Sequence, residues 1–362
     1  MTALITGGAG FIGSHLAEAL VCRGDRVIIL DDLSTGSVEN ICQVRSSPFV
    51  HCFFESVMDR RLLAELVDES NIVFHLAAAV GVRRIIESPV RTIETNVKGT
   101  ELVLEAAARK KRLVFLASTS EIYGKNNKVP FCEDDDIILG PTVRSRWSYA
   151  ASKALDEFLA LAYWREKKVP VIIARFFNTV GPRQTGRYGM VLPTFVNQAL
   201  GGLPLTVFGT GKQSRCFGYI GDAVEAVLRL VDKDGAVGEV VNIGSDEEIT
   251  IENLATLVAR RTESSSPINL IPYDQAYEPG FEDMVRRVPS LEKLVRLIDF
   301  RPSTPLPAII DSVVAHFAAK PERIPTFASP EVGSFITVNV EENACNPQNR
   351  NPEGNPQVTQ VA

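Results

Sequence analysis

The first half of the chain alternates short runs of apolar, mostly β-branched residues with longer stretches in which apolar residues recur at helical spacing. The runs predict strands near residues 3–6, 27–30, 72–76, 113–117 and 171–175, and the longer stretches predict helices near residues 13–22, 62–68, 95–109 and 149–167. Strands that alternate with helices pair in parallel through crossover connections. The pattern therefore predicts an α/β fold built on a doubly wound parallel sheet.

The alternation changes after Gly181-Pro-Arg183, where mixed helices and strands follow. We expect residues 1–180 to form the sheet domain, with a returning strand near 239–245, and residues 181–318 to form a smaller mixed C-terminal lobe. From residue 319 the chain is rich in Pro, Asn, Gln and Glu, and such a segment buries too little apolar surface to offset its ordering entropy. Residues 319–362 are predicted to be a disordered tail.

Composition narrows the class of protein. The 362 residues are 45% hydrophobic and 23% charged, which suits a soluble enzyme with a sizeable core. The net charge of −6 comes from intermixed acids and bases, so no nucleic-acid partner is expected. The six cysteines and four histidines lack metal-ligand spacing, which predicts neither a metal nor a disulfide framework. Without a signal peptide or an 18-residue apolar run, we expect a cytoplasmic protein that does not enter a membrane.

A glycine-rich turn follows the first predicted strand. Gly7, Gly10 and Gly13 in Thr6-Gly-Gly-Ala-Gly-Phe-Ile-Gly13 lie between this strand and a helix, the context in which such a turn binds a dinucleotide pyrophosphate. This predicts a Rossmann-type fold. Asp31 and Asp32 end the second strand, where a carboxylate accepts ribose hydroxyls and repels a 2′-phosphate. NAD is therefore favoured over NADP, although either aspartate could instead cap the following turn.

A second group of residues suggests proton transfer. Tyr149 and Lys153 are four apart at the start of a predicted helix, so their side chains share one face. A tyrosine that removes a hydroxyl proton near neutral pH needs a pKa below its usual value of about 10, and a lysine ammonium together with the nicotinamide charge can lower it. The strand upstream ends in Leu116-Ala-Ser-Thr-Ser-Glu-Ile-Tyr-Gly124, which adds hydroxyls and a carboxylate. Strand, hydroxyls and helix in this order indicate a catalytic site.

With these motifs the sequence resembles the extended short-chain dehydrogenase/reductase family, in its NAD-dependent nucleotide-sugar epimerase, dehydratase and decarboxylase branch. The resemblance covers roughly residues 1–318. It implies NAD as cofactor, bound by residues 1–180, and a nucleotide-diphosphate sugar, most often UDP-linked, as substrate, bound by the lobe of residues 181–318. It also implies a homodimer formed through the helices that begin near Thr95 and Tyr149.

The resemblance also implies roles for individual residues. The catalytic set is Thr119, Ser120, Glu121, Tyr149 and Lys153. The cofactor set is Gly7, Gly10, Phe11, Ile12, Gly13, Asp31, Asp32, Ser56, Val57, Leu76, Ala77, Ala78, Asn96, Tyr149, Lys153 and Phe176. The substrate set is Thr119, Asn178, Val191, Leu192, Phe195, Val207, Arg215 and Arg287, in which core packing explains the apolar members equally well. One departure is Ser56, which stands where relatives commonly carry an aspartate that contacts adenine.

The residues around the catalytic set favour one reaction of the branch narrowly. All members first oxidise C4 of the sugar to a ketone. Thr119-Ser-Glu121 is similar to the triplet of UDP-glucuronate decarboxylases, which form UDP-xylose, and Ser145-Arg-Trp-Ser-Tyr149 is similar to a bacterial uronate decarboxylase. Ser120 replaces the aspartate of glucose-type 4,6-dehydratases, and GDP-mannose 4,6-dehydratases share the triplet but prefer NADP.

Two alternatives remain open. Val80-Gly-Val-Arg-Arg84 and Gly186-Arg-Tyr-Gly-Met-Val191 look more like 4-epimerases, in which Glu121 would be a structural carboxylate. An inactive NAD-binding regulatory protein would keep the fold without the chemistry, since fold does not imply function. The presence of both Tyr149 and Lys153 argues against such a protein.

Overall fold

The computed structural model describes residues 1–79, 88–186, 190–276 and 284–320. Its centre is a seven-stranded sheet in the order β11-β6-β5-β4-β1-β2-β3, with every neighbouring pair parallel. The strands are β1 (Thr2–Thr6), β2 (Arg26–Leu30), β3 (Val50–Phe53), β4 (Ile72–His75), β5 (Leu113–Thr119), β6 (Val171–Phe176) and β11 (Val240–Ile243). The predicted α/β doubly wound sheet is confirmed.

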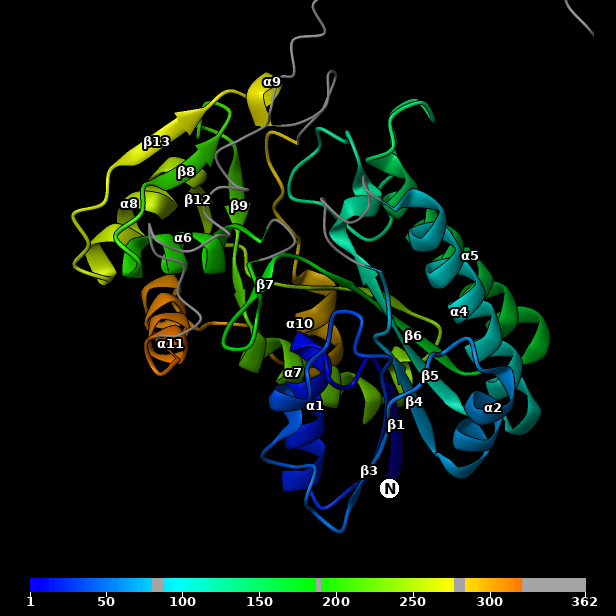
Figure 1. Ribbon diagram of the computed structural model, residues 1–362. Helices are drawn as coiled ribbons and strands as arrows, with labels where there is room; N and C mark the ends of the chain where they lie inside the picture. Colours follow the sequence, from blue (N-terminus) through cyan, green and yellow to red (C-terminus); the bar gives the residue numbers. More distant parts are fainter. Residues whose placement is uncertain (80–87, 187–189, 277–283, 321–362) are drawn as a thin grey trace, which may run out of the picture.

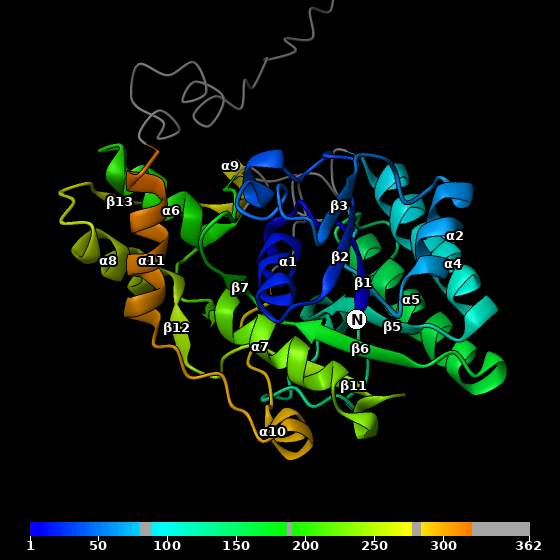
Figure 2. The ribbon, with the colours of Figure 1, turned by 90° about the horizontal axis from the view of Figure 1, so that it is seen from below.

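Helices cover both faces of the sheet (Figures 1 and 2). One face carries α1 (Phe11–Cys22), α7 (Ile220–Val231) and α10 (Glu292–Ile298), and the other carries α2 (Arg60–Glu69), α4 (Pro89–Lys110) and α5 (Trp147–Lys167). Successive strand residues point to opposite faces, so Ile5 packs in the core beneath α1 and Leu4 in the core beneath α2 and α4. Both side chains are fully buried.

The strand order reverses between β1 and β4, which are neighbours although β2 and β3 lie between them in sequence. In open parallel sheets, ligands bind outside the carboxyl ends of the strands at such a reversal. The glycine turn after β1, the segment after β4 and the end of β5 all lie at this edge of the sheet. The topology therefore brings the predicted cofactor and catalytic segments together.

Helix boundaries differ from the expected ones where local signals are weak. The helix expected from residue 95 begins at Pro89, since proline fits the first turn of a helix. The start of this helix contains the β-branched residues Val90, Thr92 and Ile93, which are poor helix formers. The sequence pattern therefore does not indicate a helix before residue 95. The helix expected from Tyr149 begins at Trp147, so Tyr149 stands in its first turn.

A smaller lobe lies beside the sheet domain (Figure 1). It contains α6 (Val191–Leu200), β8 (Leu205–Phe208), β9 (Ser214–Cys216), β12 (Glu248–Thr250), α8 (Ile251–Arg261), β13 (Ile268–Ile271), α9 (Tyr273–Ala276) and α11 (Leu306–Ala318). β13 pairs in parallel with β8, and β12 pairs antiparallel with β9. Three helices, α6, α8 and α11, close an apolar core that is separate from the two cores of the sheet domain.

Short strands join the lobe to the sheet domain. β7 (Thr179–Val180) leaves the end of β6 and pairs in parallel with β10 (Gly218–Tyr219), which leads directly into α7. The chain thus returns from the lobe to the sheet domain before β11 is formed.

Some expectations concern residues outside the described part of the chain. Most of the epimerase-like segment 80–84, residues 187–189 of the segment 186–191, and residues 321–362 of the expected tail all lie there. Within the described residues, no helix is long and apolar enough to cross a membrane, and no cluster of three or more His, Cys, Asp or Glu side chains could hold a metal ion.

Candidate active site

The glycine turn after β1 leaves no space for side chains. Gly7 has a φ of +74°, and a Cβ there would lie 2.8 Å from the backbone nitrogen of Ala77. A Cβ on Gly13 would lie 2.2 Å from the carbonyl oxygen of Gly7. The backbone therefore packs closely here and leads into the N-terminus of α1, where free N–H groups favour an anion. This cradle fits the pyrophosphate of a dinucleotide.

The two carboxylates predicted to bind the ribose, those of Asp31 and Asp32, also accept hydrogen bonds from backbone N–H groups of the turns around them. Asp31 is 7% exposed; its Oδ2 accepts a hydrogen bond from the backbone N–H of Ala9 at 2.9 Å, and its Oδ1 accepts one from Leu33 at 2.8 Å. Burial raises the pKa of Asp31. Asp32 is exposed and accepts a hydrogen bond from the backbone N–H of Ser34. Carboxylate oxygens accept more than one hydrogen bond each, so capping and ribose binding are compatible for Asp31.

The remaining cofactor candidates surround this edge of the sheet. Asn96 is buried, and its Oδ1 accepts from the backbone N–H of Ala79 at 2.9 Å while its Nδ2 donates to Ser152 at 3.2 Å, so it fixes the segment after β4. Ser56 is half-buried and accepts from the backbone N–H of Met58. The half-buried candidates are Phe11, Ile12, Leu76, Ala77 and Ala78, and the buried ones are Val57 and Phe176.

The catalytic candidates come from two adjacent elements. Thr119 ends β5, and the next residues form a single 3₁₀ turn (Ser120–Tyr123) in which Thr119 Oγ1 accepts from the backbone N–H of Glu121 at 3.2 Å. The hydroxyl of Thr119 acts on the phenol of Tyr149 in the first turn of α5, where it favours the phenolate and so partly opposes the rise of the tyrosine pKa. The strand end and the helix start therefore place a hydroxyl, a phenol and a carboxylate together.

Lys153 has a partner that the sequence reasoning missed. Its Nζ lies 2.9 Å from Oδ2 of Asp156, and both side chains are buried. Burial raises the pKa of Tyr149, and the negative charges of Glu121 and Asp156 raise it further. The lowering of this pKa by Lys153 together with the nicotinamide charge stays a prediction, and in the protein alone the charge of Asp156 offsets that of the lysine. A phenolate at Tyr149 requires a further positive charge nearby, and the oxidised nicotinamide ring of NAD⁺ carries one.

Two arginines hold the carboxylate of Glu121. Arg287 Nη2 lies 2.8 Å from Glu121 Oε1, and Arg146 Nη2 lies 3.5 Å from Oε2. Arg287 Nη1 also lies 3.5 Å from Oγ of Ser120. Burial alone would raise the pKa of Glu121, but the charges of Arg287 and Arg146, with a smaller effect from Arg215, lower it to about 2. Glu121 is therefore ionised at any working pH.

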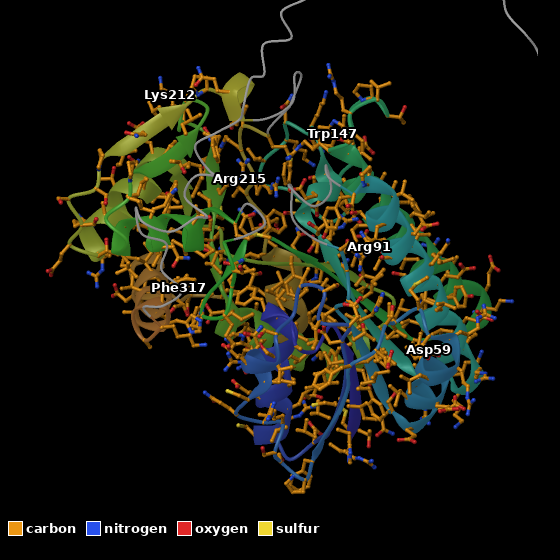
Figure 3. All side chains as sticks on the ribbon, in the orientation of Figure 1. Asp59, Arg91, Trp147, Lys212, Arg215 and Phe317 are labelled. Atoms are coloured by element: carbon orange, nitrogen blue, oxygen red, sulfur yellow. The ribbon has the colours of Figure 1, made fainter. Side chains whose placement is uncertain are left out.

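These contacts change the interpretation of the arginines. Arg287 belongs to the expected substrate set, in which the resemblance implies a phosphate contact, yet in this structure its guanidinium contacts Ser120 and Glu121 of the catalytic set. Arg146 carried no assigned role, although its position three residues before Tyr149 was a usable signal. Arg215 lies on the side of the smaller lobe nearest the sheet domain (Figure 3), and its Nη1 donates to the carbonyl oxygens of Ser214 and Met284 at 2.7 and 2.8 Å.

The apolar substrate candidates lie within the smaller lobe. Leu192, Phe195 and Val207 are at most 1% exposed and belong to its apolar core, so packing accounts for them in this structure. Val191 and Asn178 are half-buried. These two retain surface for a ligand.

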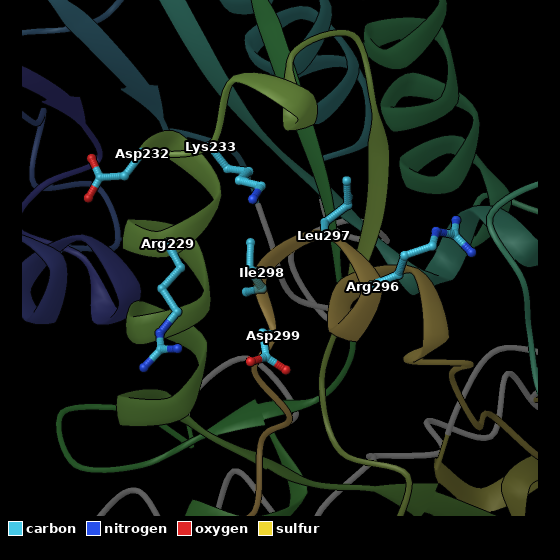
Figure 4. Close-up of a pocket in the computed structure, with 7 residues that line it drawn as sticks. All are labelled: Arg229, Asp232, Lys233, Arg296, Leu297, Ile298 and Asp299. Carbon is cyan, nitrogen blue, oxygen red and sulfur yellow. The ribbon is translucent and has the colours of Figure 1, made fainter.

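A separate cavity of about 360 Å³ lies between α7 and α10 (Figure 4). It is lined by Arg229, Asp232, Lys233, Arg296, Leu297, Ile298 and Asp299. None of these residues belongs to the glycine turn or to the catalytic set. This cavity is therefore distinct from the candidate active site.

The ion pairs of Glu121 predict how stability depends on pH. Its pKa is depressed in the folded protein, so its contribution is present above the unfolded value of about 4.5 and is lost as the pH falls toward 2. We expect a loss of about 2 kcal/mol between pH 5 and pH 3 from this group. The measurement is the free energy of unfolding in urea at pH 5 and at pH 3, for the native chain and for Glu121→Gln. The variant should lack the part of the pH-dependent loss that comes from Glu121.

Glu94→Gln is the matched control for this measurement, because Glu94 forms an exposed ion pair with Lys98 on α4. This variant should keep the native pH dependence, since exposed pairs contribute little. Equal pH dependence in the native chain and Glu121→Gln would contradict the assigned charge state of Glu121.

Known proteins resemble this chain over most of its length. The model of the family described as "NAD dependent epimerase/dehydratase family" matches residues 3–244. A UDP-N-acetyl-alpha-D-glucosaminuronate decarboxylase from Bacillus cytotoxicus is 44% identical over 302 residues, which cover 83% of this chain and 92% of the relative. UDP-glucuronic acid decarboxylase 1 of Danio rerio is 34% identical, covering 88% of this chain and 73% of the relative.

Solved structures share the fold. An epimerase from Methanothermobacter thermautotrophicus superposes with a TM-score of 0.82 at 28% identity, covering 89% of this chain and 94% of the other. A UDP-glucuronic acid 4-epimerase from Bacillus cereus, solved with UDP-glucuronic acid and NAD, has a TM-score of 0.80 at 27% identity, covering 88% and 99%.

The glycine cradle, the family match and the NAD-bound neighbour agree on the cofactor, and NAD is confirmed. The expected enzyme class is confirmed as well, because the matching relatives are enzymes of this kind. The chain belongs to the NAD dependent epimerase/dehydratase family.

Proposed function

We propose that this protein is an NAD-dependent decarboxylase of a UDP-linked hexuronic acid. The observation that carries the proposal is the carboxylate of Glu121, which is held by Arg287 and Arg146. It lies in the same turn as Thr119, whose hydroxyl acts on the phenol of Tyr149. Relatives named as UDP-uronate decarboxylases support it, at 44% identity in one case and 34% in another. The sugar is a glucuronic acid or its 2-acetamido form, the two substrates in those names.

Tyr149 and Thr119 act at O4 of the sugar. The chemistry that NAD⁺ supplies when bound is the two-electron oxidation of C4. Tyr149 takes the proton of the O4 hydroxyl as this ketone forms, and Thr119 donates a hydrogen bond to the phenolate oxygen. Once protonated, Tyr149 can donate a hydrogen bond back to O4.

Decarboxylation of the resulting 4-keto uronic acid then needs little general acid or base catalysis. A carboxylate at C6 is β to the C4 ketone, so the C5–C6 bond breaks, carbon dioxide leaves, and the electron pair forms an enolate whose charge rests on O4. The phenol of Tyr149 stabilises that charge as it develops. C5 then takes a proton from water.

The arginine cluster suits a uronate substrate. Two guanidinium groups, those of Arg287 and Arg146, face one carboxylate, that of Glu121, so the cluster has a net positive charge that attracts the C6 carboxylate. The negative charge of Glu121 repels the C6 carboxylate of the bound substrate. This repulsion weakens as negative charge moves from C6 to O4. Interactions that favour the transition state over the bound substrate accelerate the reaction.

The same geometry argues against a 4,6-dehydratase. Such an enzyme needs a carboxylic acid that protonates the leaving hydroxyl, and Glu121 cannot serve because its pKa is lowered to about 2. The neighbouring position is Ser120, which is 1% exposed and has no acidic proton to give. A 4-epimerase needs no charged cluster of this kind.

Proton NMR of product mixtures tests the proposal. The purified protein is incubated with UDP-N-acetylglucosaminuronate, UDP-glucuronate and UDP-glucose in separate samples, without and with added NAD. Loss of the C6 carboxylate from either uronate supports the proposal. Inversion at C4 with all carbons retained would establish a 4-epimerase instead, and inertness toward both uronates would refute the decarboxylase.

We also propose that the protein forms a homodimer through α4 and α5. These two helices lie side by side on one face of the sheet domain (Figures 1 and 2). They carry exposed apolar side chains: Val90 and Ile93 on α4 are 69% and 42% exposed, and Leu155 and Phe158 on α5 are 50% and 66% exposed. A second copy of this helix pair would bury them in a symmetric interface.

Phe158→Glu should convert the dimer to a monomer, because it places a charge at the most exposed apolar position of α5. Sedimentation velocity gives the mass. The matched control is Leu270→Glu on β13, where a leucine 54% exposed lies away from both helices. A native protein that sediments as a monomer, or a Phe158→Glu dimer as stable as the native one, would contradict this interface.

A further inference from the structure

Lys153 and Asp156 form a buried ion pair next to the proposed base. Lys153 is 2% exposed and Asp156 is fully buried, with 2.9 Å between Nζ and Oδ2. They are three residues apart on α5, so they share one helix face, and Tyr149 lies one turn earlier on that face. A buried pair is costly to form, and removing one partner leaves an uncompensated charge. The position of Lys153 therefore depends on Asp156.

The pair continues into a chain of buried polar groups. The hydroxyl of Thr100 of α4 stabilises the ionised carboxylate of Asp156. The Oγ1 of Thr100 lies 3.2 Å from Nε2 of His75. Nδ1 of His75 lies 2.8 Å from Oγ1 of Thr6, the last residue of β1 before the glycine turn. All four side chains are at most 2% exposed. The chain of contacts joins the catalytic lysine to the start of the cofactor cradle.

The central histidine is neutral. Burial, together with the nearby charge of Lys153, lowers the pKa of His75 to about 3. A neutral imidazole donates through one ring nitrogen and accepts through the other. His75 can therefore bridge Thr6 and Thr100 without adding a charge.

We propose that Asp156 is a positioning residue that holds the Lys153 ammonium beside Tyr149 and anchors it, through Thr100 and His75, to the strand that begins the cofactor cradle. Asp156 is fully buried, and its assigned role is to act through the lysine with which it pairs. The inference rests on the proposed roles of Tyr149 and Lys153, and it holds for any sugar that this site oxidises.

Of the described charged side chains near Lys153, Asp156 is the one that forms an ion pair with it. From its own helix, Asp156 faces Lys153 and Glu157, and its charge also acts on Tyr149. From α4 it faces Thr100. Glu157 is paired with Arg175 of β6, at 2.8 Å between Oε2 and Nη2. Among the described residues, Asp156 is the one carboxylate that pairs with Lys153. Without it, burial would disfavour the charged form of the lysine.

Asp156→Asn keeps the shape of the side chain and removes its charge. Lys153 should then lose its proton more readily, and the high-pH limb of the kcat profile should move about one pH unit or more toward acid. KM for the nucleotide sugar should change less than about twofold, because no substrate contact is removed. Asp156→Glu restores the charge and should return the limb to its native position, even where overpacking reduces kcat.

Glu157→Gln is the matched control. It removes a buried carboxylate from the next position of α5, one that pairs with Arg175 instead of Lys153. A purely structural role for Asp156 predicts that both neutral variants lose stability while both keep the native pH profile. An Asp156→Asn profile that superimposes on the native one overturns the proposal.

A thermodynamic cycle tests the same pair without any substrate. Thermal unfolding is compared for the native chain, Asp156→Asn, Lys153→Met and the double variant. We expect Asp156→Asn to lower the unfolding midpoint in the native background and to change it little in the Lys153→Met background, because the partner charge is already gone. Equal losses in both backgrounds refute the proposal. Should Asp156→Asn fail to fold, a folded double variant supports the pairing and an unfolded one contradicts it.

These readouts separate two kinds of failure. A protein that turns over neither uronate but shows the coupling between Lys153 and Asp156 would refute the decarboxylase and leave the positioning role intact. A protein that decarboxylates a uronate but shows neither the coupling nor the shift of the high-pH limb would refute the positioning role and leave the decarboxylase intact.

Discussion

Tyr149→Phe should reduce turnover of the nucleotide sugar by about 1,000-fold or more, since a positioned acid or base contributes about 10²- to 10⁴-fold to a rate. The substitution removes the phenolic oxygen that takes the O4 proton and later stabilises O4, so both the oxidation and the decarboxylation lose a contact. Because the ring is 8% exposed and only its hydroxyl is lost, the fold should persist. Steady-state kinetics on the uronate that is consumed provides the measurement.

The control for this variant is cofactor binding. NAD affinity, measured by calorimetry, should remain within about threefold of the native value, since the glycine cradle and Asp31 are unchanged. Turnover at the native rate in Tyr149→Phe would exclude Tyr149 as the base. Loss of NAD binding together with turnover would mean that the tyrosine supports the cofactor rather than the proton transfer.

The fold was predictable because short stretches of sequence indicate its strands, helices and glycine turn. Strand and helix periods identify most elements of the sheet domain, and Gly7 and Gly13 of the turn after β1 have backbone positions where a Cβ would clash with neighbouring backbone. Helix starts were less predictable where β-branched residues weaken the local helix pattern. α4 begins six residues before its expected start, in a β-branched segment that is stabilised in the folded protein by a proline in its first turn.

The catalytic site was predictable only in part, for a related reason. Thr119 and Tyr149 belong to motifs with short spacing, and the fold brings the threonine hydroxyl to the phenol. The partners of Glu121 and Lys153 depend on geometry that no spacing reveals. Arg287 comes from a segment more than 160 residues away in sequence, and its contact with Glu121 exists only in the folded chain. Asp156 looks like any acidic helix residue until its burial is known.

Glu121→Gln should reduce decarboxylation by about 100-fold, the size of effect expected when one preorganised electrostatic group is removed from an active site. Glutamine keeps the shape of the side chain but not its charge. The charge of Glu121 opposes the C6 carboxylate in the bound substrate and less so in the transition state, so its loss should lower kcat without raising KM. Rates of carbon dioxide release at several uronate concentrations separate the two constants.

The accompanying products identify the step that fails. If Glu121 acts in decarboxylation, oxidation at C4 should continue in Glu121→Gln, and a 4-keto uronic acid that retains C6 should be recovered from the denatured protein. Glu121→Asp keeps the charge on a shorter side chain and should retain more decarboxylation than the glutamine variant. Native carbon dioxide release by Glu121→Gln would reduce Glu121 to a structural partner of Arg287 and Arg146. A rise in KM with unchanged kcat would instead mean that the carboxylate orients the two arginines for substrate binding, because uniform binding affects KM alone.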